Sequence, residues 1–223
     1  MIDAYLALLG KDLRVELRTL RSLPAMALFA VTVFVVFRFG LDRTGLEGEL
    51  AAGVLVVTLL FAGILAINRL FVAERDEGGF ELVRLAPLDR TVLYAAKASA
   101  LLLYLIALEL IAVPVFALFF LDSAAALPPL IPVLLLADLG LALIGTLIST
   151  IATMSSARDL LAPLILLPLL VPLVIATAGA AEPVLRAGGP EYERFGTWLA
   201  VLGLYDGVFA LVGYAVFDFL LED

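Results

Sequence analysis

Six long apolar blocks limit what this chain can fold into more than any other feature of the sequence. They cover approximately residues 24–39, 50–72, 94–121, 128–151, 160–181 and 197–220. A helix needs about 20 mostly apolar residues to cross the hydrocarbon core of a bilayer. Of the 223 residues, 64% are hydrophobic, against about 45–50% in a soluble domain. The sequence therefore predicts an all-α integral membrane protein with six transmembrane helices, and we expect residues 1–223 to form one domain.

The fifth block carries three prolines within its apolar run, Pro163, Pro168 and Pro172. Proline removes a backbone hydrogen bond and clashes with the carbonyl group four residues before it. We therefore expect this helix to be kinked or broken, and a re-entrant segment is an open alternative to a full span.

Residues 2–21 precede the first block and predict a different kind of helix. Apolar residues recur there at spacings of three and four, which indicates a single stripe. The stripe consists of Ile2, Leu6, Leu9, Leu13, Leu17 and Leu20. A line of basic residues runs beside it, formed by Lys11, Arg14, Arg18 and Arg21. This pattern is typical of an amphipathic helix in the membrane surface, with its basic residues near anionic headgroups. A soluble, core-facing helix is the alternative.

Basic residues also indicate the orientation, because they collect on the cytoplasmic side of a membrane protein. With the N-terminus inside, most of the 14 basic residues lie on the inner side. The outer side would hold Arg38, Arg43, Arg186 and Arg194. Six spans then predict that both termini are cytoplasmic.

The segment 74–90 is the longest charged interruption between two blocks. Two glycines break the preceding helix, residues 80–86 mix apolar and charged side chains, and a proline ends the segment. We expect a short cytoplasmic helix that docks into a groove on a partner protein, and a solvated connector is the alternative. The expected contact residues are Gly78, Gly79, Phe80, Glu81, Val83, Arg84, Leu85 and Pro87.

Three acidic residues lie deep within the blocks: Glu109, Asp138 and Asp206. A charge at the bilayer centre costs at least about 2.5–3.5 kcal/mol, and the block positions give these acids no Lys or Arg at the same depth. Each acid must therefore be protonated, hydrated or paired with a neighbouring chain. The functional interpretations are a proton relay, a translocation path or a subunit contact. The structural interpretation is a protonated side chain that is hydrogen-bonded between helices.

The sixth block carries small residues at spacings of three and four, including the pair Gly203 and Gly207. Such faces let two helices approach closely. The simpler interpretation is that this face packs within the chain. The functional interpretation is that it forms the contact between two copies of the chain.

Several kinds of chemistry are excluded by what the sequence lacks. It contains no G-x-x-x-x-G-K-[ST] phosphate loop, so any ATP and Mg²⁺ must be bound by another chain. It has no Cys and no His, which removes the usual zinc ligands and the strong haem ligands. A net charge of -8 argues against nucleic-acid binding. We expect a chain that is no enzyme and binds no cofactor.

Three stretches, taken together, resemble the CcmB family. They are the run Phe61–Phe71 with the following loop to Pro87, the proline-rich run Leu166–Ala178, and the opening Lys11–Arg18. The resemblance rests on their order and spacing and covers nearly the whole chain. Asn68 departs from the family pattern, because an acidic residue is expected there, so that position carries no charge in this chain.

CcmB is the permease subunit of the ABC-type haem exporter of cytochrome c maturation. The resemblance implies a six-span permease of the ABC-2 or type V exporter kind in a bacterial inner membrane. It also implies a homodimer that works with the ATPase CcmA, with CcmC and CcmD, and with the haem chaperone CcmE. ATP hydrolysis is tied there to release of the haem-loaded chaperone, and haem is a candidate cargo.

Other functions remain open alternatives at this point. One is an ABC-2 permease for a drug, lipid or polysaccharide. Another is a proton-coupled carrier that uses Glu109, Asp138 and Asp206. The last is a membrane scaffold without transport. Because the chain lacks His and Cys, a mechanical role is favoured over haem ligation.

Overall fold

The computed structural model describes residues 2–19, 22–40, 46–76, 90–121, 123–153, 158–186 and 193–220. Within these ranges the chain is helical, with short connections and no strand. The long helices are α1 (Ile2–Thr19), α2 (Ser22–Val35), α3 (Gly48–Asp76), α5 (Arg90–Phe120), α6 (Leu127–Thr153), α7 (Arg158–Ala181) and α8 (Phe195–Leu220). A π-helical turn, Val36–Gly40, extends α2, and the 3-10 turns Ala124–Ala126 and Glu182–Val184 adjoin α6 and α7.

Six helical segments are long and apolar enough to cross a membrane. They are Ser22–Gly40, Gly48–Asn68, Arg90–Phe120, Ala124–Ile151, Leu164–Val184 and Phe195–Val216. These segments match the six predicted blocks in order and closely in extent, so the all-α, six-span prediction is confirmed. The short helix predicted for residues 80–86 lies outside the described residues.

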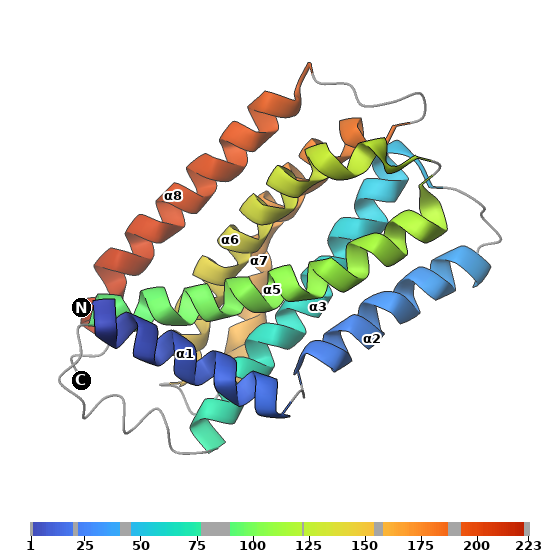
Figure 1. The fold of residues 1–223 in the computed structure, drawn as a ribbon. Helices are drawn as coiled ribbons and strands as arrows, with labels where there is room; N and C mark the ends of the chain where they lie inside the picture. The colour runs from blue at the N-terminus through green and yellow to red at the C-terminus, as the bar shows by residue number, and fades with distance from the viewer. Residues whose placement is uncertain are drawn as a thin grey trace.

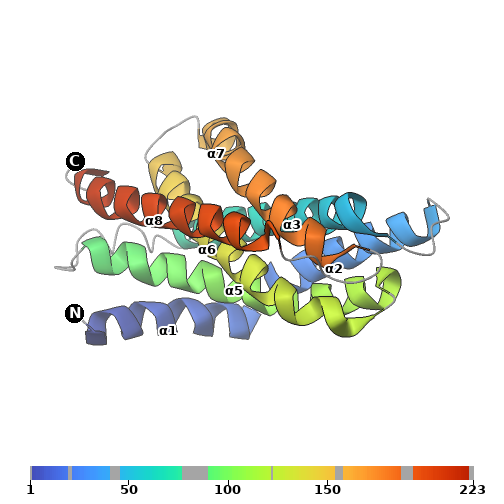
Figure 2. The ribbon, with the colours of Figure 1, turned by 90° about the horizontal axis from the view of Figure 1, so that it is seen from above.

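The six spans form one bundle around α6, which contacts α3, α5, α7 and α8. Figure 1 shows α8 along one edge of this bundle, and α1 beside the first half of α5. Figure 2, seen from above, shows α1 and α5 side by side as well. The first residues of α1 and the last residues of α8 lie at the same end of the bundle, as an even number of crossings requires.

Aromatic side chains fill the core where α2 meets α5. Phe34 and Phe116 are fully buried, and their ring centroids lie 5.4 Å apart at a tilt of 60°. Phe120 completes the cluster, with its ring centroid 5.3 Å from that of Phe116. Tilted aromatic pairs at such distances are the favoured arrangement, so this cluster fixes the first span against the third.

Glycines allow the close crossing of α3 and α6. A methyl group at Gly63 of α3 would lie 2.4 Å from Leu141 Cδ2 of α6, and one at Gly145 of α6 would lie 2.5 Å from Ile67 Cδ1 of α3. Helices in lipid gain stability from this kind of contact, because water does not drive their association.

The proline-rich fifth span is one continuous helix, α7. A broken helix and the re-entrant alternative are therefore not what the structure contains, whereas a kink at the prolines stays a prediction. Pro168 and Pro172 are four residues apart on one exposed face, so the hydrogen bonds that they remove are lost on one side of the helix only. Transmembrane helices tolerate proline when the rest of the helix remains bonded and packed.

Candidate intramembrane acidic site

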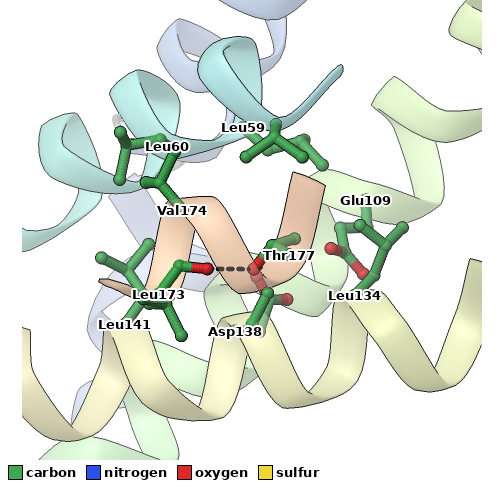
Figure 3. Close-up of a pocket in the computed structure, with 11 residues that line it drawn as sticks. Leu59, Leu60, Glu109, Leu134, Asp138, Leu141, Leu173, Val174 and Thr177 are labelled. Atoms are coloured by element: carbon green, nitrogen blue, oxygen red, sulfur yellow. Dashed lines mark hydrogen bonds between the residues drawn. The ribbon is translucent and has the colours of Figure 1, made fainter. Parts of the chain in front are cut away.

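Glu109 of α5 and Asp138 of α6 face each other within the bundle, next to Thr177 of α7 (Figure 3). Both side chains line the same small cavity. Asp138 is only 6% exposed. One oxygen of each acid, Glu109 Oε1 and Asp138 Oδ2, has no hydrogen-bond partner among the described residues. The structure therefore brings together two of the three acids that the sequence singled out.

A small cavity of about 30 Å³ adjoins this acid pair. Apart from the two acids and Thr177, its lining is apolar: Val56, Leu59, Leu60, Leu134, Ala137, Leu141, Leu173 and Val174. The Thr177 hydroxyl donates a hydrogen bond of 2.7 Å to the carbonyl oxygen of Leu173. Four helices, α3, α5, α6 and α7, thus line one small polar cavity with otherwise apolar walls.

Asp206, the third acid, does not join this pair. It is 4% exposed and lies against Gly140 of α6, where a methyl group would come within 2.6 Å of Asp206 Oδ1. Neither of its carboxyl oxygens has a hydrogen-bond partner in the described part of the chain. The neighbouring Tyr205 hydroxyl donates a hydrogen bond to the carbonyl oxygen of Leu169, which ties α8 to α7.

A buried ion pair links α1 to α5, and the sequence reasoning gave it no role. Lys97 Nζ lies 2.9 Å from Asp12 Oδ2, and the two side chains are 6% and 7% exposed. The Tyr104 hydroxyl donates a 2.8 Å hydrogen bond to the carbonyl oxygen of Asp12, and Tyr5 donates one of 2.9 Å to Ser99 Oγ. The signal in the sequence was an acid within the basic line of α1 and a lysine within an apolar block, since buried charges are usually paired.

The predicted basic line on α1 includes Lys11, Arg14 and Arg18, which are exposed, while Arg21 lies outside the described residues. The apolar stripe is also largely uncovered, with Ile2 at 75%, Leu6 at 56% and Leu17 at 71% exposure. The soluble, core-facing alternative would bury this stripe. The helix instead packs on α5 through Tyr5 and Asp12 and leaves Leu6 and Leu17 exposed.

Gly203 and Gly207 do not pack within the chain. A methyl group at either position would meet no atom within 4 Å, and both residues are exposed. The simpler of our two interpretations is therefore wrong for this pair. The reason is the rotation of α8, which turns Asp206 and Gly213 toward the bundle instead: Gly213 lies against Tyr94.

A larger, polar cavity of about 590 Å³ opens where α3, α7 and α8 meet, at the end of the bundle away from α1. Charged residues of both signs line it, including Glu49, Glu182, Arg186 and Arg194. Arg186 and Glu182 form an ion pair there. Trp198 also lines it and lies against Gly179, where a methyl group would come within 2.6 Å of the indole ring. The sequence reasoning assigned Arg186 and Arg194 to the outer side but did not identify this cavity.

The predicted partner-docking segment, from Gly78 to Pro87, lies outside the described residues. The structure does describe the helices on either side of it. α3 ends at Asp76, eight residues beyond the last residue of its apolar span, and α5 begins at Arg90.

Comparison with known proteins gives consistent matches. The model of the family described as "CcmB protein" matches residues 3–220. A protein named "Heme exporter protein B" from Rhodobacter capsulatus is 30% identical over 94% of this chain and 94% of its own length. Proteins of the same name from Paracoccus denitrificans and Pseudomonas aeruginosa are 30% and 29% identical, over 79% and 91% of this chain and 81% and 90% of their own lengths.

The match spans all six membrane helices, and the bundle has the fold that the sequence resemblance implies. This chain therefore belongs to the CcmB family.

Proposed function

We propose that this chain is the membrane permease subunit of an ABC-type complex of cytochrome c maturation. The observation that carries the proposal is the family match over residues 3–220. In the complex, a separate CcmA-like ATPase binds ATP and Mg²⁺, and hydrolysis drives haem export or release of a haem-loaded, CcmE-like chaperone. The chain works as a homodimer with CcmC-like and CcmD-like proteins, in a bacterial inner membrane with both termini cytoplasmic.

The helices on either side of segment 77–89 support a mechanical role. α3 has 29 residues and α5 has 31, which gives lengths of about 43 Å and 46 Å at 1.5 Å per residue. The hydrocarbon core of a bilayer is about 30 Å thick. Both helices therefore extend beyond the core, and an ATPase that closes against residues 78–90 pushes on the ends of these two levers.

The contacts of α1 support a bracing role for that helix. Asp12 and Lys97 join it to α5 in the second turn after Arg90, and the Tyr104 bond adds a second contact farther along α5. A push on the start of α5 thus also moves α1, whose exposed leucines hold it in the membrane surface. The lack of His and Cys favours this transmission of motion over tight haem ligation by the chain itself.

The docking step is tested by charge reversal in segment 78–90. The double variant Phe80→Asp, Arg84→Glu is expected to lose co-purification with the ATPase in mild detergent and to lose stimulation of ATP hydrolysis, while membrane insertion is unchanged. Arg194→Glu is the matched control, because it reverses a charge at the opposite end of the bundle. Co-purification of the double variant at the wild-type yield would rule out docking through this segment.

The cargo is tested separately in cells. A strain without this chain is expected to lose c-type cytochromes, measured by haem staining of denatured proteins, and the wild-type chain is expected to restore them. Normal cytochromes in that strain, together with a defect in drug, lipid or polysaccharide export, would assign the permease to another cargo.

A further inference from the structure

Glu109 and Asp138 are two ionisable residues within the bundle that the proposed function does not use. They face each other between two spans, at a cavity lined by four helices (Figure 3). Asp138 is more than nine-tenths buried, and Asp138 Oδ2 and Glu109 Oε1 have no hydrogen-bond partner among the described residues. Two carboxylates placed in this way would repel each other, which favours the protonated form of one of them.

The surroundings offer no other way to balance the two acids. The α3 residues at the cavity are Val56, Leu59 and Leu60, and the α7 residues are Leu173, Val174 and Thr177. Asp206 of α8, which packs against Gly140 of α6, is itself acidic. No described cationic side chain lines the cavity. Two adjacent carboxylates in such a site repel each other and lack solvation, so the neutral form of one is strongly favoured.

The cavity itself points to a bound water molecule. Its volume of about 30 Å³ exceeds the ~10–15 Å³ that one water needs. Asp138 Oδ2 and Glu109 Oε1 lack partners in the described part of the chain, and Asp138 is more than nine-tenths buried. Thr177 adds a hydroxyl whose oxygen can accept a further bond. A water here would have the two to four polar partners that buried waters usually have.

We propose that Glu109, Asp138 and the adjoining cavity form an intramembrane proton-binding site, in which the two carboxyl groups share one proton and a single water occupies the cavity. A metal cation fits less well, because hard cations take about six oxygen ligands and only three oxygen-bearing side chains line the cavity. Proton uptake and release at this site changes the contact between α5 and α6, whether or not the chain works with an ATPase.

Infrared difference spectroscopy of the full chain in lipid nanodiscs tests the site directly. The wild-type protein is expected to show the C=O stretching band of a protonated carboxylic acid at neutral pH, and this band is expected to shift in D₂O. Asp138→Asn and Glu109→Gln should each remove that component. Asp206→Asn should leave it in place, and so should Glu49→Gln, which changes an exposed acid on α3.

Three results would overturn the proposal. The first is a wild-type spectrum without a protonated carboxyl band at neutral pH, which needs no variant to be informative. The second is loss of the band when choline chloride is replaced by NaCl at constant pH, because that result would make the site one for a metal cation. A band that survives both Asp138→Asn and Glu109→Gln in folded protein would likewise place the proton elsewhere.

Discussion

Gly213 and Gly203 lie on the same helix, α8, but differ completely in what surrounds them. Gly213 is buried against the ring of Tyr94, whereas a methyl group at Gly203 would meet no atom within 4 Å. The Tyr94 hydroxyl donates a 3.1 Å hydrogen bond to the carbonyl oxygen of Leu143. The Tyr94 ring therefore cannot move away from α8 without straining or losing its bond to α6.

Alanine substitutions at these two glycines should have effects of opposite sign. At Gly213 the new methyl group would lie 2.3 Å from the Tyr94 hydroxyl, and overpacking of this kind costs about 1–3 kcal/mol. At Gly203 the change removes the entropic cost of a helical glycine, about 0.5–1 kcal/mol. Thermal unfolding in detergent should thus show a lower midpoint for Gly213→Ala and an equal or higher one for Gly203→Ala. A fall of the same size for both variants would contradict this account.

At this scale the sequence predicted which residues are unusual, but not which residues meet. Glu109 and Asp138 were predictable as candidates because acids are rare in apolar blocks. Their contact depends on how α5 and α6 are rotated toward each other, which spacing along one helix does not reveal. For the same reason the sequence left two interpretations for Gly203 and Gly207, packing within the chain or contact between two copies. In the structure, Gly63, Gly145 and Gly213 make the close contacts within the chain.

At the scale of whole helices, a buried ion pair couples α1 to the start of α5. The Asp12–Lys97 pair is buried on both sides, and the gain from such a pair is offset by the cost of removing two charges from water. Removal of one partner is different, because it leaves an unpaired charge in a buried site. The pair therefore locks α1 in one position on α5 more than it adds net stability.

A double-mutant cycle on this pair tests the lock. Lys97→Met alone is expected to destabilise the protein by about 3–5 kcal/mol, because the buried Asp12 would lose its buried partner and keep only the half-exposed Lys11 nearby. The double variant Asp12→Asn, Lys97→Met should recover most of that loss. The measurement is the unfolding midpoint in detergent, combined with the protection of α1 from proteolysis.

Lys11→Met is the control for this cycle. Lys11 Nζ also lies near Asp12, 3.5 Å from Oδ1, but its side chain is 45% exposed. An exposed pair of this kind contributes about 0–1 kcal/mol, so the control should stay close to wild type. If Lys97→Met is as mild as Lys11→Met, α1 is not held by the buried pair.

The helices themselves were largely predictable, because about 20 apolar residues in a row leave few structures other than a membrane span. The exception was the fifth span, for which we expected a kink or a break at the prolines, and the helix does not break. Whether a proline breaks a helix depends on its neighbours, and Pro168 and Pro172 share an exposed face of α7. The sequence shows the missing donors but not the packing of the opposite face, where Leu166, Leu170 and Leu173 are buried.

The bundle as a whole leaves one helix poorly covered. Of the six spans, α8 has the smallest share of buried residues, 17%. It lies along one edge of the bundle (Figure 1). Large apolar side chains such as Leu204 and Leu211 are about 70% exposed. Contact with lipid alone would be enough to cover them. Gly203 and Gly207 add a flat strip between such side chains, and small residues four apart are a common surface for close helix contact in membranes.

We expect two copies of the chain to meet through this strip of α8, as the proposed homodimer requires. The double variant Gly203→Leu, Gly207→Leu fills the strip without disturbing the fold, because neither position contacts the rest of the chain. Small residues let two helices approach closely, and leucine side chains in the strip would hold them apart, so the dimer should dissociate more readily. The dimer fraction is measured by native mass spectrometry in mild detergent and by photobleaching steps in liposomes.

Gly53→Leu on α3 is the matched control, since a methyl group there also meets no atom within 4 Å. An unchanged dimer fraction in the double variant would place the interface on another face of the bundle, and an equal loss in Gly53→Leu would show that the effect is not specific to α8.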